Sequence, residues 1–243
     1  MLNYRVAPEL LLPFVPAGTE LDLWNGAAYL SVVGFVFADT RVLGVPIPFH
    51  RTFEEVNLRL YVRRTVAGET RRGVTFIREL VPRVAIAAVA RWTYNEPYLA
   101  LPMRHRVEPA DPADLANSSP SSRDGHASIR GSIRAEYEWR TRSGWSGIHM
   151  TTESASTPAP SGSHEEFITH RLWGYTTQRD GTTIEYEVRH RAWTVWLART
   201  AQLSGDMARV YPSQLVPALS HPPDSALFAD GSAVTVHSPN RVP

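Results

Sequence analysis

The chain has 243 residues and a formal net charge of +1; its 25 basic side chains are all arginine, and it has no cysteine. Without lysine, the chain has no side chain for a Schiff base, for anchoring pyridoxal phosphate or for a phosphate-binding loop. Without cysteine, it has no disulfide, thiolate nucleophile, iron–sulfur cluster or cysteine zinc site.

The remaining composition is that of a soluble globular protein, with 43% hydrophobic and 20% charged residues. Near-equal numbers of basic and acidic residues provide no electrostatic surface for nucleic acid or an anionic membrane. The longest apolar run, residues 84–90, is far shorter than the roughly 20 residues of a membrane helix, and Pro8, Glu9 and Pro13 interrupt the N-terminal apolar stretch. We therefore expect a cytoplasmic protein with no nucleic-acid or membrane partner.

The first half of the chain predicts mainly hairpins. Asn25-Gly26 is a strong hairpin signal, Pro8 suits the first turn of a short helix, and Pro82 precedes an alanine-rich helix. The predicted elements are a helix over 7–15, strands over 20–24 and 27–37, strands over 53–66 and 72–80, a helix over 83–92 and a strand from about 98 to 107.

The second half contains two segments poor in large apolar residues, 108–127 and 154–163, which predict mobile surface loops. Ser163 is a typical N-cap residue, with Glu165 and Glu166 in the first turn that follows and Arg171 at the helix end, as the helix dipole favours. The predicted strands are 128–140, 145–152, one before the turn at 178–181, 182–196 and 233–237.

This pattern predicts a mainly β, β-rich α+β fold in a single domain over residues 1–243. Nine or ten strands with two or three short flanking helices favour one twisted antiparallel sheet that curls into a closed barrel or cone. A barrel of about this size can enclose a small ligand in a central pocket.

The segment FEEVNLRLYVRR carries the most informative alternation. Side chains two residues apart share a face of a strand, so one face is apolar and the other carries Glu55, Asn57, Arg59 and Tyr61. One interpretation is an ordinary strand with its polar face in water. The other is a pocket wall, in which the Arg59 guanidinium donates two parallel hydrogen bonds to a carboxylate.

A second segment, EYEVRHRAWTVW, places His190 on a face with Tyr186, Val188 and Ala192. There His190 is either a satisfied core residue or a general base oriented by a carboxylate. His164 and His170 lack metal-binding spacing, and the sequence has no GxSxG serine motif or glycine-rich nucleotide loop. We expect no metal and no cofactor.

Several segments together resemble a known family: NYRVAPELLLPFVPAGTELDLWNGAAYLSVVGF, FEEVNLRLYV, GVTF, EEFITHRLWGYT and VRHRAW. They are similar to the uncharacterised bacterial YqjF-like family, which belongs to the acetoacetate decarboxylase-like superfamily. The resemblance covers nearly the whole chain in order. It implies an antiparallel closed sheet or cone around a central pocket, flanked by short helices.

The resemblance to the decarboxylase itself has one decisive departure. There, a lysine after the alanine-rich helix forms the Schiff base with the substrate, and an upstream strand supplies a glutamate. Here Tyr98 stands at the lysine position, and Glu55 is the counterpart of the glutamate. The resemblance therefore implies the fold and the pocket, and the composition excludes Schiff-base chemistry on a lysine.

Two functions remain as hypotheses. The protein binds a small organic acid or carbonyl compound in the pocket, through Asn57, Arg59, Tyr61 and Tyr98. Alternatively, it is a lysine-independent acid/base enzyme, lyase- or hydrolase-like, with Glu55 and His190 as catalytic residues on a small carboxylate or carbonyl substrate. The expected partner is a small molecule. The sequence has no signature of oligomeric state, so a homo-oligomer stays open.

Overall fold

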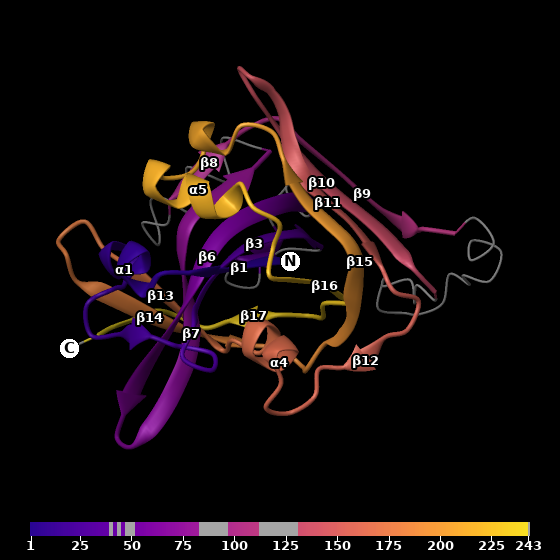
Figure 1. The fold of residues 1–243 in the computed structure, drawn as a ribbon. Helices are drawn as coiled ribbons and strands as arrows, with labels where there is room; N and C mark the ends of the chain where they lie inside the picture. Colours follow the sequence, from indigo (N-terminus) through magenta and orange to yellow (C-terminus); the bar gives the residue numbers. More distant parts are fainter. Residues whose placement is uncertain (39–40, 43–44, 47–51, 83–96, 112–130, 243) are drawn as a thin grey trace.

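The structure, a computed structural model, describes residues 1–38, 41–42, 45–46, 52–82, 97–111 and 131–242 (Figure 1). The predicted helix over 83–92 and most of the predicted loop over 108–127 lie outside the described residues.

Most of the described chain is β-strand, as predicted. The strands are β1 (Leu2–Val6), β2 (Glu20–Leu21), β3 (Ala28–Phe37), β4 (Arg41–Val42), β5 (Val45–Pro46), β6 (Phe53–Val66), β7 (Glu69–Val81), β8 (Tyr98–Ala100), β9 (Met103–Pro109), β10 (Ile133–Thr141), β11 (Gly144–Thr152), β12 (Thr157–Pro158), β13 (Trp173–Thr177), β14 (Thr183–Arg189), β15 (Thr194–Ser204), β16 (Ser225–Ala229), β17 (Thr235–Val236) and β18 (Asn240–Arg241).

The helical segments are short. They are α1 (Pro8–Leu11), η1 (Leu12–Phe14), α4 (His164–Thr169), η2 (Met207–Arg209), η3 (Ser213–Leu215) and α5 (Val216–Leu219). Helix α4 begins where the sequence predicts, because the Ser163 hydroxyl accepts a hydrogen bond from the Glu166 N–H at 3.2 Å.

One large sheet contains most of the strands in the order β17-β14-β13-β7-β6-β3-β1-β16-β15-β11-β10-β9. Most neighbours are antiparallel, but β13 and β8 both pair with β7 in parallel. The sheet is therefore mixed rather than purely antiparallel. Strand β1 near the N-terminus pairs with β16 near the C-terminus, and this pairing joins the two halves of the order.

The sheet curls strongly but does not close (Figure 1). Its end strands among the described residues, β17 and β9, do not pair with each other, so the predicted closed barrel or cone is not observed. Strand β17 is only two residues long, and β9 exposes Arg104, His105 and Arg106. Short strands and charged edge residues both disfavour edge-to-edge pairing.

Three predicted elements differ from those in the structure. The hairpin predicted across Asn25-Gly26 is present only as a tight turn closed by one bridge between Trp24 and Ala27. The strand before it, β2, pairs with β6 instead of β3. The strand expected over 98–107 is divided into β8 and β9. The strand expected over 182–196 ends at Arg189 and resumes at Thr194, so two strands replace one.

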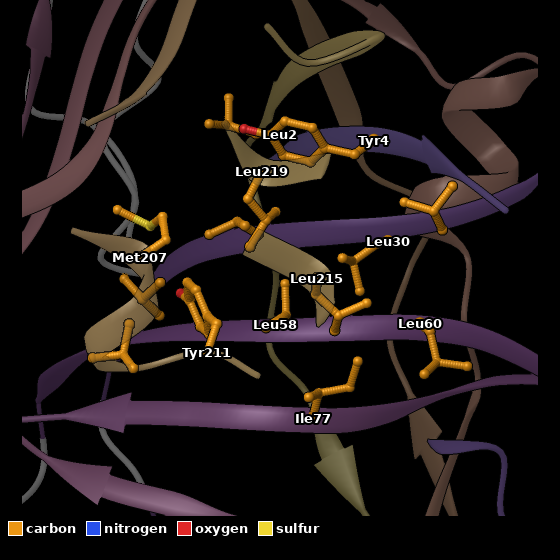
Figure 2. Close-up of a cluster of buried hydrophobic side chains, with 14 of the residues drawn as sticks. Leu2, Tyr4, Leu30, Leu58, Leu60, Ile77, Met207, Tyr211, Leu215 and Leu219 are labelled. Carbon is orange, nitrogen blue, oxygen red and sulfur yellow. The ribbon is translucent and has the colours of Figure 1, made fainter. Parts of the chain in front are cut away.

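The predicted apolar face of β6 lies in the largest hydrophobic core (Figure 2). Leu58 and Leu60 are fully buried against β1, β3 and the C-terminal segment that contains η2, η3 and α5. Each such leucine contributes about 1.5–3 kcal/mol to folding. This core fixes β6 firmly, and with it the polar residues on the opposite face.

Candidate functional site

The polar face of β6 is covered by protein rather than by solvent. Glu55, Asn57 and Tyr61 are buried to within 2% of complete, and Arg59 is half-buried. The interpretation of this face as an ordinary solvated surface is therefore wrong. A β-bulge against β7 between Leu58 and Arg59 shifts the register at this point. Bulges of this kind bend the strand and re-aim nearby side chains.

Glu55, Asn57 and Tyr98 form one group at the start of β6. The Tyr98 hydroxyl donates to Glu55 Oε2 at 3.1 Å, and Asn57 Nδ2 donates to Glu55 Oε1 at 3.3 Å. Tyr98 reaches this place because β8 pairs with β7 in parallel, with Tyr98 beside Glu79. Asn57 Oδ1 is buried and accepts no hydrogen bond from the residues that the structure describes. The structure thus brings three of the predicted site residues together.

Arg59 faces helix α4 instead. Its Nη2 donates to the Ile168 carbonyl oxygen at 2.9 Å, while its Nε is buried and has no hydrogen-bond partner in the described part of the chain. Among the described residues, no carboxylate lies within ion-pair distance of Arg59. The guanidinium is thus a half-buried cation that only neutral groups hold in place.

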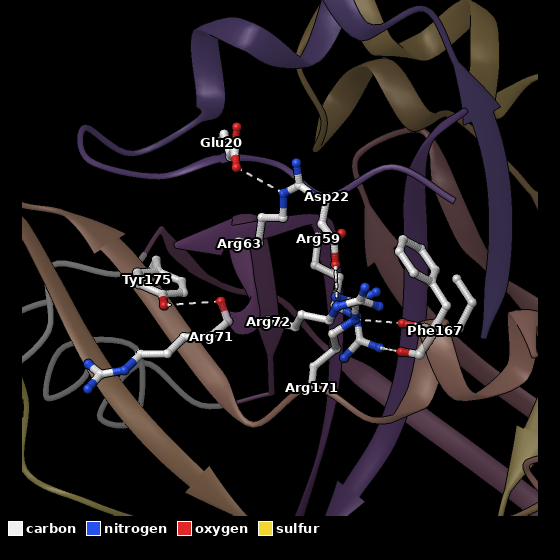
Figure 3. A network of polar contacts seen from close by, with 10 residues as sticks. Glu20, Asp22, Arg59, Arg63, Arg71, Arg72, Phe167, Arg171 and Tyr175 are labelled. Carbon is white, nitrogen blue, oxygen red and sulfur yellow. Dashed lines mark hydrogen bonds and ion pairs between the residues drawn. The ribbon is translucent and has the colours of Figure 1, made fainter. Parts of the chain in front are cut away.

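Arg171, which the sequence patterns did not indicate as a site residue, is a neighbour of Arg59 at the end of α4. Its Nε donates to the Phe167 carbonyl oxygen at 2.5 Å and its Nη1 to Asp22 Oδ2 (Figure 3). The two arginines therefore bond to consecutive carbonyl groups at the end of α4. Burial lowers the pKa of Arg171, and the bond to Asp22 opposes that effect. Asp22 is thus already engaged, and Arg59 stays without an anionic partner.

Tyr61 belongs to a hydrogen-bond chain inside the protein. The Ser31 hydroxyl donates to Asn3 Oδ1 at 2.7 Å and lies 2.6 Å from the Tyr61 hydroxyl. Because a serine hydroxyl has one hydrogen, Tyr61 is the donor to Ser31. The Tyr61 hydroxyl therefore donates its hydrogen bond within the core. The centre of its ring lies 5.6 Å from the Arg59 Cζ atom and 4.9 Å from the Arg171 Cζ atom.

His190 lies outside the strand on which the alternation placed it, because β14 ends at Arg189. Its Nδ1 lies 2.8 Å from the Arg191 carbonyl oxygen, and its ring stacks on Trp193 at 4.4 Å, with His170 at 5.8 Å. Burial lowers its pKa, as do the charges of His170 and Arg59. Among the described hydrogen bonds, those of His190 and those of Glu55 have different partners, so the described residues do not pair the two predicted catalytic residues.

Two hollows formed by described residues lie on β10, β11 and β15, away from β6. A central pocket around Glu55, Arg59 and Tyr98 therefore stays a prediction, as do the cytoplasmic location and any self-association. The described residues contain no cluster of three or more His, Asp or Glu side chains suited to a metal ion. They also contain no helix long and apolar enough to span a membrane.

The sequence contained only part of the signal for this neighbourhood. Arg171 could be placed at a helix end, but its partner Asp22 lies 149 residues earlier in the chain. Ser31 lies on β3, which pairs with β6, and Asn3 lies on β1, which pairs with β3; no local pattern reveals this strand order. Such contacts depend on strand order, which the alternation of side chains does not determine.

Comparison with solved structures defines the class of protein. The enzyme MppR of enduracididine biosynthesis, solved with pyruvate, matches with a TM-score of 0.61 at 16% identity over 99% of this chain and 86% of that one. Acetoacetate decarboxylase from Legionella pneumophila matches with a TM-score of 0.60 at 13% identity over 100% of this chain and 83% of that one. The protein thus has the acetoacetate decarboxylase-like fold.

The family is narrower than the fold. Residues 1–233 match the family model DUF2071, described as an uncharacterized conserved protein, and the chain belongs to this family. The chain is 27% identical over 195 residues to the uncharacterized protein YqjF of Bacillus subtilis. The aligned segment covers 79% of this chain and 69% of that protein. The YqjF-like resemblance found in the sequence is confirmed.

Proposed function

We propose that this protein binds a small organic acid or carbonyl compound, with Arg59 as the anion-binding group and without Schiff-base chemistry. The observation that carries the proposal is the half-buried Arg59 guanidinium, which has no carboxylate partner among the described residues. A cation partly removed from water is stabilised strongly by an opposite charge. An arginine fork supplies that pairing in a geometry that matches a carboxylate.

The residues around Arg59 favour an anion over a neutral or cationic ligand. Arg171 is close by and is already paired with Asp22, and Arg72 lies 3.8 Å from the same carboxylate. Arg171 and Arg72 therefore share the Asp22 carboxylate, and Arg59 has no carboxylate partner among the described residues. The Tyr61 ring packs against the guanidinium groups of Arg59 and Arg171. We assign no ligand contact to the Tyr61 hydroxyl, because it donates its hydrogen bond to Ser31.

The other end of the ligand would approach Asn57. Alternate residues of a strand lie about 7 Å apart, so a compound of a few carbons spans the interval from Arg59 to Asn57. The free Asn57 Oδ1 suits a hydroxyl group or a hydrated carbonyl, which can donate to it. Beyond Asn57 lie Glu55, to which Asn57 is hydrogen-bonded, and Tyr98, which is hydrogen-bonded to Glu55. The pyruvate in the MppR structure, a small keto acid on a similar fold, supports the same class of ligand.

A thermal-shift panel tests the proposal. Acetate, lactate, pyruvate and succinate are compared with acetamide, lactamide and pyruvamide, which lack the charge. At a hundred times its dissociation constant, a carboxylate should stabilise the protein by about 2.7 kcal/mol, whereas its amide should have little effect. A panel in which no carboxylate raises the melting temperature, or in which amides do so equally, contradicts the proposal.

A second candidate, an acid/base enzyme, rests on the buried Glu55 carboxylate held by Tyr98 and Asn57. A fixed carboxylate next to a carbonyl compound can exchange an α-proton. We expect the protein to speed deuterium incorporation into pyruvate, and Glu55→Gln to abolish this exchange while carboxylate binding persists. Proton NMR in D₂O measures the rate. Equal rates with and without the wild-type protein would rule out this function for pyruvate and leave binding alone.

A further inference from the structure

A second candidate site lies on the outward face of strands β10, β11 and β15, well removed in the sheet order from β6. A hollow of about 240 Å³ occurs there. Its lining includes Arg134, Glu136, His149, Thr151, Thr200 and Gln202. This is somewhat smaller than the roughly 300–1,000 Å³ of drug-sized pockets, so it suits a ligand of metabolite size.

The strand register explains why a hollow forms on this face. Thr151 pairs with Arg134 on one side and Thr200 on the other, which places two short side chains in the middle of a row. Their hydroxyl groups bond to each other at 2.5 Å. Directly beside them, a β-bulge makes Thr152 pair with Ala198, so that Arg199 is the extra residue. The bulge bends β15, and the short threonines leave the space open.

The two charged residues that line this hollow form no ion pair with another described residue, whereas neighbouring charged residues on the same face do. On the same side of the sheet, Arg104 pairs with Glu138 at 2.6 Å and Arg106 with Glu108 at 2.8 Å. Across β9 and β10, Glu108 faces Arg134 and Arg106 faces Glu136, but Glu108 and Arg106 pair with each other. In the described chain, Arg134 and Glu136 form no direct ion pair and no side-chain hydrogen bond, although they are two residues apart on one strand face. One unpaired cation and one unpaired anion therefore line the same small space.

We propose that this hollow binds a small zwitterion, namely a free α-amino acid. Its carboxylate would pair with the Arg134 guanidinium and its ammonium group with the Glu136 carboxylate. The Thr200 hydroxyl and the Gln202 amide offer further hydrogen bonds. A simple anion would meet the negative charge of Glu136, and a simple cation would meet Arg134. Only a ligand that carries both charges satisfies both residues. This site is independent of Arg59 and of the proposed function.

Calorimetric titration with a mixed set of probes tests the assignment. L-Serine, L-alanine and L-glutamine are compared with N-acetyl-L-alanine, which lacks the ammonium charge, and L-alaninamide, which lacks the carboxylate. We expect saturable binding of at least one free amino acid, with a dissociation constant on the order of 1 mM or below. Each blocked derivative should bind at least tenfold more weakly.

Three variants make the test specific. Arg134→Gln and Glu136→Gln should each weaken binding of the free amino acid at least tenfold; Arg134 is exposed and Glu136 partly buried, and both substitutions keep the approximate size of the side chain. Arg140→Gln removes an exposed arginine from the same strand face, six residues from Arg134 and outside the lining of the hollow, and should leave binding unchanged. The proposal is overturned if no free amino acid binds, if the blocked derivatives bind equally well, or if all three variants behave alike.

Discussion

Arg171 is enclosed by aromatic rings at 4.0 Å from Phe167 and 4.9 Å from Tyr61, and its guanidinium bonds to the equally buried Asp22. The Phe167 carbonyl oxygen accepts the hydrogen bond of its Nε, while Nη2 has no hydrogen-bond partner among the described residues. At the scale of single residues, this ion pair fixes the position of the helix end against which Arg59 lies. The pair is stabilising only as long as both charges are present.

Asp22→Asn should therefore destabilise the protein by about 3–5 kcal/mol, because it leaves the Arg171 charge buried without its counter-ion. Combining it with Arg171→Leu should restore part of the loss. Urea unfolding of the two single variants and the double variant measures the coupling. Glu20→Gln, which removes the exposed partner of Arg63, is the control and should cost about 1 kcal/mol or less. Equal effects for Asp22→Asn and Glu20→Gln would contradict this role.

At the scale of elements, α4 links the N-terminal half of the sheet to the candidate site. It is six residues long, too short to be stable alone. Its stability comes from the Ser163 cap, from burial of Phe167 and Ile168, and from the two arginines at its last carbonyl groups. The cap was predictable from the sequence, because the signal is local. The contact of Arg59 with α4 was not predictable, because Arg59 and Ile168 are more than a hundred positions apart in the chain.

Ser163→Ala tests the cap, and with it the support that α4 gives to Arg59. The change removes the acceptor for the Glu166 N–H and should cost about 1 kcal/mol. Ser161→Ala, two residues earlier at an exposed position, should have no measurable effect. Thermal or urea unfolding compares the two. Ser163→Asp, which keeps an acceptor at the cap, should restore the stability; failure to do so would argue against a capping role.

At the scale of the whole molecule, the sequence predicted the mainly β fold and the family correctly, and β6 with the residue bounds that the structure has. Closure of the sheet was not correctly predicted, because strand count does not determine which edges meet. His190 was misplaced because alternation was continued through residues 190–193, where the chain leaves the strand. Both errors concern long-range order, which the periodicity of one segment does not encode.

The absence of lysine limits the chemistry that this fold can support. On an acetoacetate decarboxylase-like fold, Tyr98 donates a hydrogen bond to the buried Glu55, where the sequence resemblance places the lysine of the decarboxylase. The side-chain chemistry left to this chain is that of carboxylates, amides, phenols, imidazoles and guanidinium groups. Among these groups, the Arg59 guanidinium is the one on which we base the proposed binding, because it is a half-buried cation with no carboxylate partner among the described residues.

Calorimetric titration of the carboxylate panel into wild-type protein, Arg59→Gln and Arg63→Gln tests that claim most directly. Arg63 lies on the same strand and is paired with Glu20 at the surface, so it is a matched control. Loss of a charge-assisted hydrogen bond costs about 1.5–3 kcal/mol. We therefore predict saturable binding of at least one carboxylate to the wild type and to Arg63→Gln, and at least tenfold weaker binding to Arg59→Gln. Undiminished binding to Arg59→Gln, or no binding to the wild type, would contradict the account.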